Sequence, residues 1–439
     1  MNKIIKHNWQ CFIIMLFLFI ALLSNNSPAR EISSNEYQLR RLKLLGLMDD
    51  SSAVVLKTAD VKLRNGDVTY RYRQESNCFY LTGLNETNSY LMLVPKGVEV
   101  GREKIKILFF KPDVKNDSLL NDGSSVLNSS KFILTLKSIL PGLNKIYTAS
   151  GDVQFVHDWL NDRMLFVERD NKKYFEAKNH GVKIKNISTI INQLREIKSE
   201  AEIASIQKAI NITKDGIVSA IKICKPGCWE YQLRAAIEGE MLMQGSDYPG
   251  FPSIIGSGEN SLVLHYDKDN RQMQNGDVVV MDVGAEYGGY SADITRTIPV
   301  SGKFTEAQKK IYSLVLDAQK QAIDIIKPGI SIYDLDKKVL EVFAKAGMDS
   351  FLPHGVSHPL GLDVHDVASN DTLKAGMVIT IEPGLYFPTV AKNVGAEFRG
   401  FGVRIEDDIL ITTDGHKILT GNVPKEIADV EALFLNDEE

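Results

Sequence analysis

The sequence predicts an α/β (α+β) protein with two folded domains, the second of which contains an internal duplication. Its 439 residues exceed the size at which a single hydrophobic core stops growing, so two domains are expected. Segments 276–284 and 376–384 share one pattern, in which a glycine, an apolar run, an acid and a second glycine follow at matching spacings. Lys-Pro-Gly also recurs upstream of both, at 225–227 and 327–329. This repetition predicts two related half-domains arranged with pseudo-two-fold symmetry.

The composition is that of a globular protein without a nucleic-acid partner. Hydrophobic residues make up 44% of the chain and charged residues 24%, which are ordinary values for a soluble fold. The net charge is −5 and is spread without long runs of one sign. A nucleic-acid-binding protein would instead present a basic face, so we expect no nucleic-acid partner.

The first 29 residues are predicted to be a secretory signal peptide. Lys3 and Lys6 precede an apolar run at 11–23, which polar and small residues follow up to Ala29. The apolar run has thirteen residues, whereas a membrane-spanning helix needs about 20. We therefore expect cleavage near Ala29 and export of the protein to the periplasm or the exterior. The alternative is an uncleaved signal that anchors the protein in a membrane.

The predicted N-terminal domain, residues 30–175, has a mixed pattern and no evident catalytic cluster. Its strand-like runs lie at 70–72, 78–81, 90–94 and 105–110. A polar, irregular segment at 176–190 is predicted to link it to the second domain.

The predicted C-terminal domain, residues 191–439, twice combines helices with antiparallel strands. Ser199 and Thr305 each begin a capping-box pattern, and both helices are expected to end at a Pro-Gly pair. The β-branched runs expected as strands are 277–283, 290–298, 377–381 and 402–411. With the signal removed, Cys78, Cys224 and Cys228 remain. Cys224 and Cys228 flank Lys-Pro-Gly, and whether they pair is left open.

Two acids of the first half are expected to face each other across a hairpin. A hairpin centred between Tyr287 and Gly288 places Asp282 directly opposite Asp293, and Gly288-Gly289 supplies residues suited to the turn. Like charges on facing positions repel, and burial adds a desolvation cost. A bound cation would remove both penalties. The alternative is that both carboxylates lie on a solvated face.

The second half supplies two more acids and three histidines. Glu382 ends the repeated strand as Asp282 does, and Glu406 lies in the following strand. The histidines fall within twelve residues: His354, His358 and His365. Four ionised carboxylates carry a charge of −4, which two divalent ions balance. Oxygen ligands with one imidazole suit manganese, with cobalt, iron or zinc as alternatives. Two such ions would activate water and polarise a carbonyl, so the sequence predicts metal-assisted hydrolysis.

At these motifs the chain resembles the pita-bread metallopeptidases, and among them the aminopeptidase P family. Residues 72–85 are similar to the creatinase-type N-terminal domain of that group. The catalytic part carries a Gly-Ser-Gly-Glu-Asn segment that leads to His265, Ser-Ala-Asp293, His354-Gly-Val-Ser-His358, Ile-Glu382-Pro-Gly and Arg404-Ile-Glu406. The resemblance covers nearly all of the chain after the signal, and all five metal-ligand positions match.

The resemblance implies a role for each of these residues. The implied ligands of a dinuclear, manganese-type centre are Asp282, Asp293, His358, Glu382 and Glu406. Glu382 would also be the general base that takes a proton from a metal-bridging water or hydroxide. His265 and His365 would stabilise the scissile carbonyl or its oxyanion. The implied residues on the proline side of the substrate site are His354, Tyr386 and Arg404.

The implied activity is release of the N-terminal residue from peptides with proline in the second position. The implied assembly is a homo-oligomer, a dimer or a tetramer. A prolidase, which cleaves Xaa-Pro dipeptides with the same ligands, is the nearest alternative. Ser357 in His-Gly-Val-Ser-His favours the aminopeptidase, whereas Pro359 also occurs in prolidase-like sequences. A pita-bread domain kept only for binding would be expected to lack metal ligands, and here none is missing.

Overall fold

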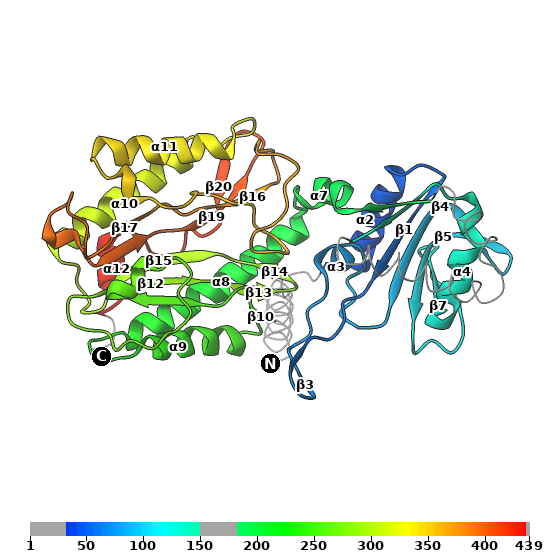
Figure 1. Ribbon diagram of the computed structural model, residues 1–439, viewed down its shortest axis with the longest axis horizontal. Helices are drawn as coiled ribbons and strands as arrows, with labels where there is room; N and C mark the ends of the chain where they lie inside the picture. The colour runs from blue at the N-terminus through cyan, green and yellow to red at the C-terminus, as the bar shows by residue number, and fades with distance from the viewer. Residues whose placement is uncertain (1–31, 150–181, 436–439) are drawn as a thin grey trace, which may run out of the picture.

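The computed structural model describes residues 32–149 and 182–435, which form two parts of mixed α/β structure (Figure 1). The α/β class predicted from the sequence is confirmed. The predicted signal peptide at 1–29 lies outside the described residues. Among the described residues, no helix combines the length and the apolar character that crossing a membrane requires. The boundaries predicted for the two domains stay predictions.

The N-terminal part is built on a seven-stranded mixed sheet with the strand order β6-β7-β5-β4-β1-β8-β9. Its strands are β1 (Ser52–Lys57), β4 (Tyr90–Val100), β5 (Glu103–Lys111), β6 (Ser118–Leu119), β7 (Ser125–Asn128), β8 (Lys145–Thr148) and β9 (Lys183–Asn186). A separate hairpin is formed by β2 (Leu63–Asn65) and β3 (Val68–Thr69). Its helices are α2 (Ser34–Gly46), α3 (Ser76–Thr82), α4 (Phe132–Ile139) and α7 (Ser188–Arg195).

Both faces of this sheet are covered, because successive side chains of a strand point to opposite sides. Val54 and Leu56 of β1 belong to the apolar cluster that contains Leu44 of α2 and Leu81 of α3. The intervening residues of β1 pack in a second cluster with Leu136 of α4. Strand β1, in the interior of the sheet, is therefore apolar on both faces, which explains its continuous hydrophobic run.

Two of the predicted N-terminal strands are wrong. Residues 78–81 lie in helix α3, because the Glu75 side chain accepts a hydrogen bond from the backbone of Cys78 and caps the helix. Gly83, with φ of 65°, then ends the helix in the left-handed conformation. Residues 70–72 follow strand β3 and are not in a strand. The runs at 90–94 and 105–110 are confirmed as parts of β4 and β5.

The described part of the predicted linker is not irregular. Strand β9 pairs in parallel with β8 and completes the edge of the N-terminal sheet, and helix α7 follows at once. The polar composition of 183–186 reflects its position at the sheet edge, where three of the four side chains are exposed. The remainder of 176–190 lies outside the described residues.

The C-terminal part consists of small antiparallel sheets between two pairs of helices (Figure 1). The first half contains α8 (Glu200–Ile223), α9 (Glu230–Met243), β10 (Tyr248–Pro249), β11 (Ile254–Ser257), β12 (Val278–Val283), β13 (Ala285–Tyr287), β14 (Tyr290–Ser291) and β15 (Ile294–Pro299). The second half contains α10 (Glu306–Asp324), α11 (Ile332–Lys345), β16 (Val378–Ile381), β17 (Gly384–Phe387), β18 (Phe401–Arg404), β19 (Asp407–Ile411), β20 (His416–Ile418) and α12 (Ile427–Ala432). The predicted duplication is visible in this repeated order of elements.

The first helix of each half begins as the sequence predicts. Ser199 forms a capping box with Glu202 at the start of α8, and Thr305 forms one with Gln308 at the start of α10. In each case the side chain of the cap accepts a backbone hydrogen bond, and the third residue returns one. The starts of both helices are thus set by equivalent local signals.

The register of the first hairpin differs from the prediction. Tyr287 pairs with Tyr290, so the turn consists of Gly288 and Gly289, and Asp282 faces Thr295 instead of Asp293. The prediction was wrong because both glycines adopt positive φ, 59° and 80°, and fill the two central positions of the turn. Since Asp293 lies two residues before Thr295, both acids still project from the same face, as diagonal neighbours.

The second half has a different register. Ile381 pairs with Asp407 on one side of a gap, and Gly384 pairs with Arg404 on the other. The two ladders share one register, which places Glu382 opposite Glu406 within the gap. The direct opposition predicted for the first pair of acids therefore occurs in the second pair.

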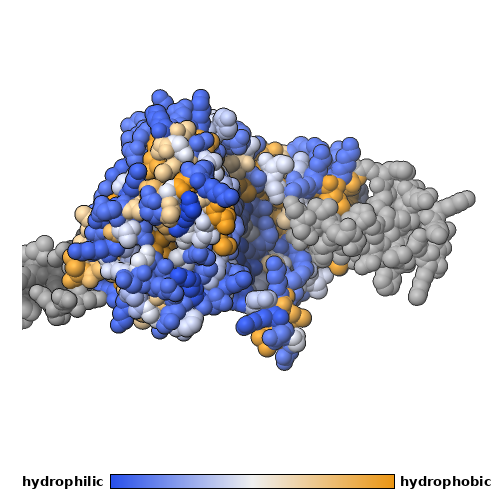
Figure 2. All heavy atoms as spheres, turned by 60° about the vertical axis from the view of Figure 1, so that its left-hand side comes forward, coloured by the Kyte–Doolittle hydropathy of each residue, from blue (hydrophilic) through white to orange (hydrophobic). Residues whose placement is uncertain are grey.

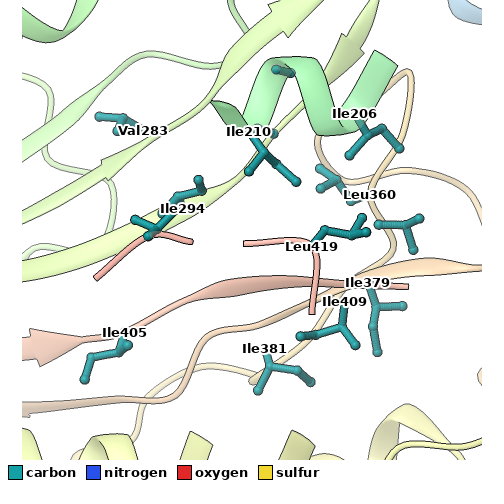
Figure 3. Packing of buried hydrophobic residues seen from close by; sticks show 14 of the residues in the cluster. Ile206, Ile210, Val283, Ile294, Leu360, Ile379, Ile381, Ile405, Ile409 and Leu419 are labelled. Carbon is teal, nitrogen blue, oxygen red and sulfur yellow. The ribbon is translucent and has the colours of Figure 1, made fainter. Parts of the chain in front are cut away.

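Each of the four acids is followed or preceded by an aliphatic residue that is fully buried. These neighbours are Val283, Ile294, Ile381 and Ile405, all 0% exposed. All four belong to one apolar cluster that also contains Ile206 and Ile210 of α8, and Figure 3 labels these six residues. Because neighbouring side chains on an extended chain point in opposite directions, burying the aliphatic residue turns the acid to the other face. Each such burial contributes about 1.5–3 kcal/mol, which holds the acids in place.

The face of the molecule that Figure 2 shows is mainly hydrophilic where it is coloured, with apolar side chains scattered over it. Among the described residues, Cys224, which is buried, and Cys228 both carry free thiols. The pairing of Cys224 with Cys228 that the sequence left open is therefore not formed.

Candidate metal centre

Five of the predicted ligands converge where the two halves meet. Ligand atoms of Asp293, His358 and Glu406 all lie within 4.8 Å of one another. His358 Nε2 is 3.5 Å from Asp293 Oδ2 and 3.6 Å from Glu382 Oε1. His358 itself is fixed beside β16, because its backbone exchanges hydrogen bonds with Thr380. The centre thus takes ligands from both halves of the duplication.

Asp282 is the fifth member of the group. Its Oδ2 accepts a hydrogen bond of 2.7 Å from Arg404. Its Oδ1 is buried and has no hydrogen-bond partner among the described residues. An orphaned carboxylate oxygen in a buried site is costly unless a further ligand satisfies it.

Crowding and burial favour the neutral form of the acids in the protein without metal. Burial, and then the charges of Glu406 and Asp282, raise the pKa of Asp293 well above its ordinary value. Burial, followed by the charges of Glu382 and Asp282, does the same to the pKa of Glu406. The pKa of Glu382 is raised to about 8, chiefly by burial, although Arg404 opposes the shift. Divalent cations would reverse this preference.

His354 and His358, both half-buried, have lowered pKa values that favour the neutral imidazole. Burial lowers the pKa of His358 to about 4, and a backbone hydrogen bond with Pro359 opposes the shift only partly. The pKa of His354 is also lowered to about 4, again mainly by burial. A neutral imidazole is the form that coordinates a metal. His358 is therefore ready to act as a ligand without losing a proton.

A hydrogen-bonded group of three residues lies beside the acids. Arg404 donates to Tyr386 Oη at 2.7 Å as well as to Asp282, and His354 Nε2 lies 3.1 Å from the same Tyr386 oxygen. Burial alone would lower the pKa of Arg404, but the charges of Tyr386 and Asp282 outweigh it and the net shift is upward. The guanidinium therefore keeps a permanent positive charge next to the acids.

His365 and His265 lie at the edge of the centre and are both exposed. The rings of His365 and His358 are 4.2 Å apart between centroids. His265 follows the 3₁₀ turn Gly258–Leu262, which packs against β12, β17 and β18. The charge of His265 reaches His354, whose pKa it helps to lower. The structure thus brings nine of the ten predicted site residues together through contacts with one another, and His265 lies close by.

Sequence reasoning missed two residues that support the centre. Thr295 Oγ1 donates a hydrogen bond of 2.7 Å to Glu406 Oε2 and accepts one from Arg404. Gln319 of α10 is fully buried and donates to the carbonyl oxygens of Ile381 and Ile405, which directly precede Glu382 and Glu406. Thr295 could have been found from the period of two that places it on the face of Asp293. Gln319 lies on a remote helix, and no pattern points to it.

The donor set fits divalent metal ions. Three buried carboxylates lie together with the half-buried Glu382 and His358, and one carboxylate oxygen lacks a partner. The crowded acids resist ionisation unless cations compensate their charge. Carboxylate oxygens with one imidazole suit hard or borderline ions such as manganese, cobalt, iron or zinc. The residues that would hold them are Asp282, Asp293, His358, Glu382 and Glu406.

This electrostatic arrangement predicts a pH dependence of metal stabilisation. Glu382 has a folded-state pKa of about 8, above the value of an unfolded chain, so the metal-free fold holds protons that unfolding releases. Stability of the metal-free protein should therefore fall as the pH rises from about 4.5 toward 8. Metal binds the ionised form, so the rise in Tm caused by manganese should be larger at pH 8 than at pH 5.5. Differential scanning fluorimetry at both pH values measures it, and an equal rise at both would contradict it.

Comparisons with known proteins place both parts of the chain. Residues 204–413 match metallopeptidase family M24, and residues 37–124 match the aminopeptidase P N-terminal domain. The chain is 34% identical to Xaa-Pro aminopeptidase of Escherichia coli (strain K12), over 92% of this chain and 98% of that protein. It is 32% identical to Xaa-Pro aminopeptidase 3 of Homo sapiens, over 92% of this chain and 86% of that protein.

A solved structure agrees with these relatives. Aminopeptidase P from E. coli with the inhibitor Pro-Leu superimposes with a TM-score of 0.82 at 33% identity, covering 92% of this chain and 99% of that chain. A zinc-substituted form of the E. coli enzyme with product matches with the same TM-score. With both domain matches in sequence order and this coverage, the chain belongs to the aminopeptidase P group of metallopeptidase family M24.

Proposed function

We propose that this protein is a dinuclear metal-dependent aminopeptidase that releases the first residue from peptides with proline in the second position. The observation that carries the proposal is the complete set of buried acids around neutral His358. A domain kept only for binding would have no need to maintain four repelling carboxylates. Relatives named Xaa-Pro aminopeptidase align over 92% of the chain, which favours this activity over that of a prolidase.

Proline explains why a dedicated site is needed. It has no backbone N–H, so a peptidase that positions the leaving residue through this donor loses its hold on an Xaa-Pro bond. When bound, the two ions would supply a Lewis acid for the carbonyl and lower the pKa of the attacking water.

The remaining catalytic roles would be filled by side chains of this protein. Glu382 would accept the proton, because its carboxylate belongs to the ligand group, with Oε1 3.6 Å from His358 Nε2. His365 and His265, exposed at the edge of the centre, are available to donate to the carbonyl oxygen. The group of His354, Tyr386 and Arg404 lies beside Asp282 and Glu382 and would form the wall of the proline site.

We further propose manganese as the metal and a homo-oligomer, a dimer or a tetramer, as the assembly. The ligand types support manganese, although cobalt, iron and zinc bind the same donors. The resemblance to the family supports the oligomer. We also propose export after cleavage near Ala29, supported by the basic residues and short apolar run of the first 29 residues.

Two short peptides test the proposed activity. Ala-Pro-Ala should be cleaved to alanine and Pro-Ala, and the dipeptide Ala-Pro should be cleaved much more slowly, with both reactions abolished by a chelator. Chromatography of the products after incubation with the manganese-loaded protein gives both rates. Faster cleavage of Ala-Pro would identify a prolidase, and cleavage of neither peptide would leave only a binding role.

A further inference from the structure

The segment between His358 and His365 is held as a closed loop. The backbone N–H of Asp366 donates to the Pro359 carbonyl at 2.9 Å, which joins the two ends. Within the loop, the Gly361 carbonyl accepts a hydrogen bond of 2.9 Å from Ser291, two residues before Asp293. His365 is the last residue inside this closure. Its position therefore depends on what holds Asp366.

Two buried cations hold the Asp366 carboxylate. Lys198 Nζ donates to Asp366 Oδ2 at 2.8 Å, and Arg195 Nη2 makes a short hydrogen bond to Oδ1. The side chains of Asp366 and Lys198 are each 1% exposed, and that of Arg195 is 3% exposed. Both cations come from the end of α7 and the connection to α8, where the chain enters the catalytic part.

The N-terminal part orients the same group. Arg195 Nη1 donates to Asn77 Oδ1 of α3 at 2.9 Å. Arg195 also donates to Asp363 Oδ2 at 2.8 Å, while Ser76 donates to Asp363 Oδ1 at 2.6 Å. The loop that carries His365 is thus fixed by side chains from two segments about 170 and 290 residues away in sequence.

Gly361 makes room for this arrangement. A Cβ at this position would lie 2.1 Å from Asp366 Oδ2 and 3.0 Å from Lys198 Cε. Such a contact is far too short, so any side chain here would displace the ion pair. The backbone of the loop is therefore shaped around the carboxylate and its cations.

A buried ion pair of this kind is a poor source of stability. Removing charges from water costs several kcal/mol per ion, and apolar replacements are often as stable or more stable. What a buried pair does provide is a fixed geometry. We propose that Asp366, held by Arg195 and Lys198, is a positioning residue that sets the place of the His365 ring beside His358. This inference rests on the peptidase activity proposed above.

A double-mutant cycle tests it. Lys198→Met in the otherwise normal enzyme should lower kcat for Ala-Pro-Ala by about 10- to 100-fold, as loss of a residue that orients a functional group does, with metal content unchanged. In a His365→Ala background the same substitution should have almost no further effect, because the residue it positions is gone. Losses that multiply in the double variant would overturn the proposal, since Lys198 would then act independently of His365.

Lys374→Met is the matched control. Lys374 lies in the same region but pairs with Glu196, not with Asp366, and its side chain is 41% exposed. It should leave kcat within about two-fold of the normal value, as expected of an exposed charge. An equal loss of kcat in Lys198→Met and Lys374→Met would contradict a specific role for the Lys198–Asp366 pair. Lys198→Arg, which keeps the charge, should restore most of the rate, and failure to restore it would count against the charge as the cause.

A crystal structure of the variant tests the proposal when its activity is too low to measure. In Lys198→Met, the His365 ring should leave its place against His358 while Asp293, Glu382 and Glu406 stay within coordinate error. An unmoved His365 would overturn the proposal. If the Lys198→Met chain does not fold, Asp366→Asn, which keeps the shape of the side chain, is put through the same cycle. If the unaltered protein cleaves no Xaa-Pro peptide, the proposed function fails, whereas the structural comparison still decides the positioning.

Discussion

Asp293→Ala is expected to abolish both metal retention and peptidase activity. Asp293 is almost fully buried among three other acids and lies 3.5 Å from His358, so its loss removes a charge from the middle of the ligand set. Because metal Lewis acidity contributes several kcal/mol to the transition state, the rate should fall by on the order of a thousand-fold or more. Metal analysis of the purified variant, together with Ala-Pro-Ala kinetics, measures both effects.

Asp293→Ala should also change the Tm of the protein in opposite ways without and with manganese. The pKa of Asp293 is raised well above its ordinary value in the metal-free fold, so ionising it at pH 8 destabilises that fold. Removing it should raise the Tm of the metal-free protein at pH 8, while the gain in Tm caused by manganese disappears. Asp277→Ala is the control. Asp277 lies just before β12, the strand that pairs with β15, and it forms an ion pair with Arg271 outside the centre. Near-normal turnover by Asp293→Ala would refute its assignment as a ligand.

Glu382→Gln is expected to have the second largest effect. The substitution keeps the size of the side chain but removes its charge and its ability to accept a proton. General acid–base catalysis contributes about 10²- to 10⁴-fold, so kcat should fall by that factor even at saturating manganese, while KM changes little. The interpretation of Glu382 as a general base depends on this fall in kcat at saturating manganese.

A metal titration separates the two roles of Glu382. If Glu382 were a ligand only, excess manganese would restore kcat to near the normal value, and that result would contradict the assignment as a base. Glu397→Gln, on the exposed 3₁₀ turn Ala396–Phe398, provides a matched control that should leave kcat and KM unchanged. Steady-state kinetics at several manganese concentrations give the answer for both variants.

The candidate site could be predicted from the sequence because its acids occupy repeated strand ends. The pattern of acid and glycine after an apolar run marks Asp282 and Glu382 alike, and the next strand in each half supplies Asp293 and Glu406. What could not be predicted was the register. Two glycines can fill a turn in more than one way, and only the structure shows that both occupy its centre.

Other features of the fold escaped prediction because tertiary context decides them. The run at 78–81 has the composition of a strand, but capping by Glu75 and Gly83 makes it helical. Lys198 and Asp366 are 168 residues apart, and neither carries a local pattern that indicates a buried pair. Local signals such as the capping boxes of α8 and α10 were recovered because Ser199 and Thr305 depend only on residues within one turn.

The metal content of the active protein tests the central claim most directly. Divalent ions would compensate the charge of the four crowded acids and would make the site hydrolytic. Elemental analysis against activity should give two divalent ions per chain in the fully active protein, no turnover of Ala-Pro-Ala after chelation, and recovery when manganese is returned. Full activity in a preparation that contains no divalent metal would contradict the account.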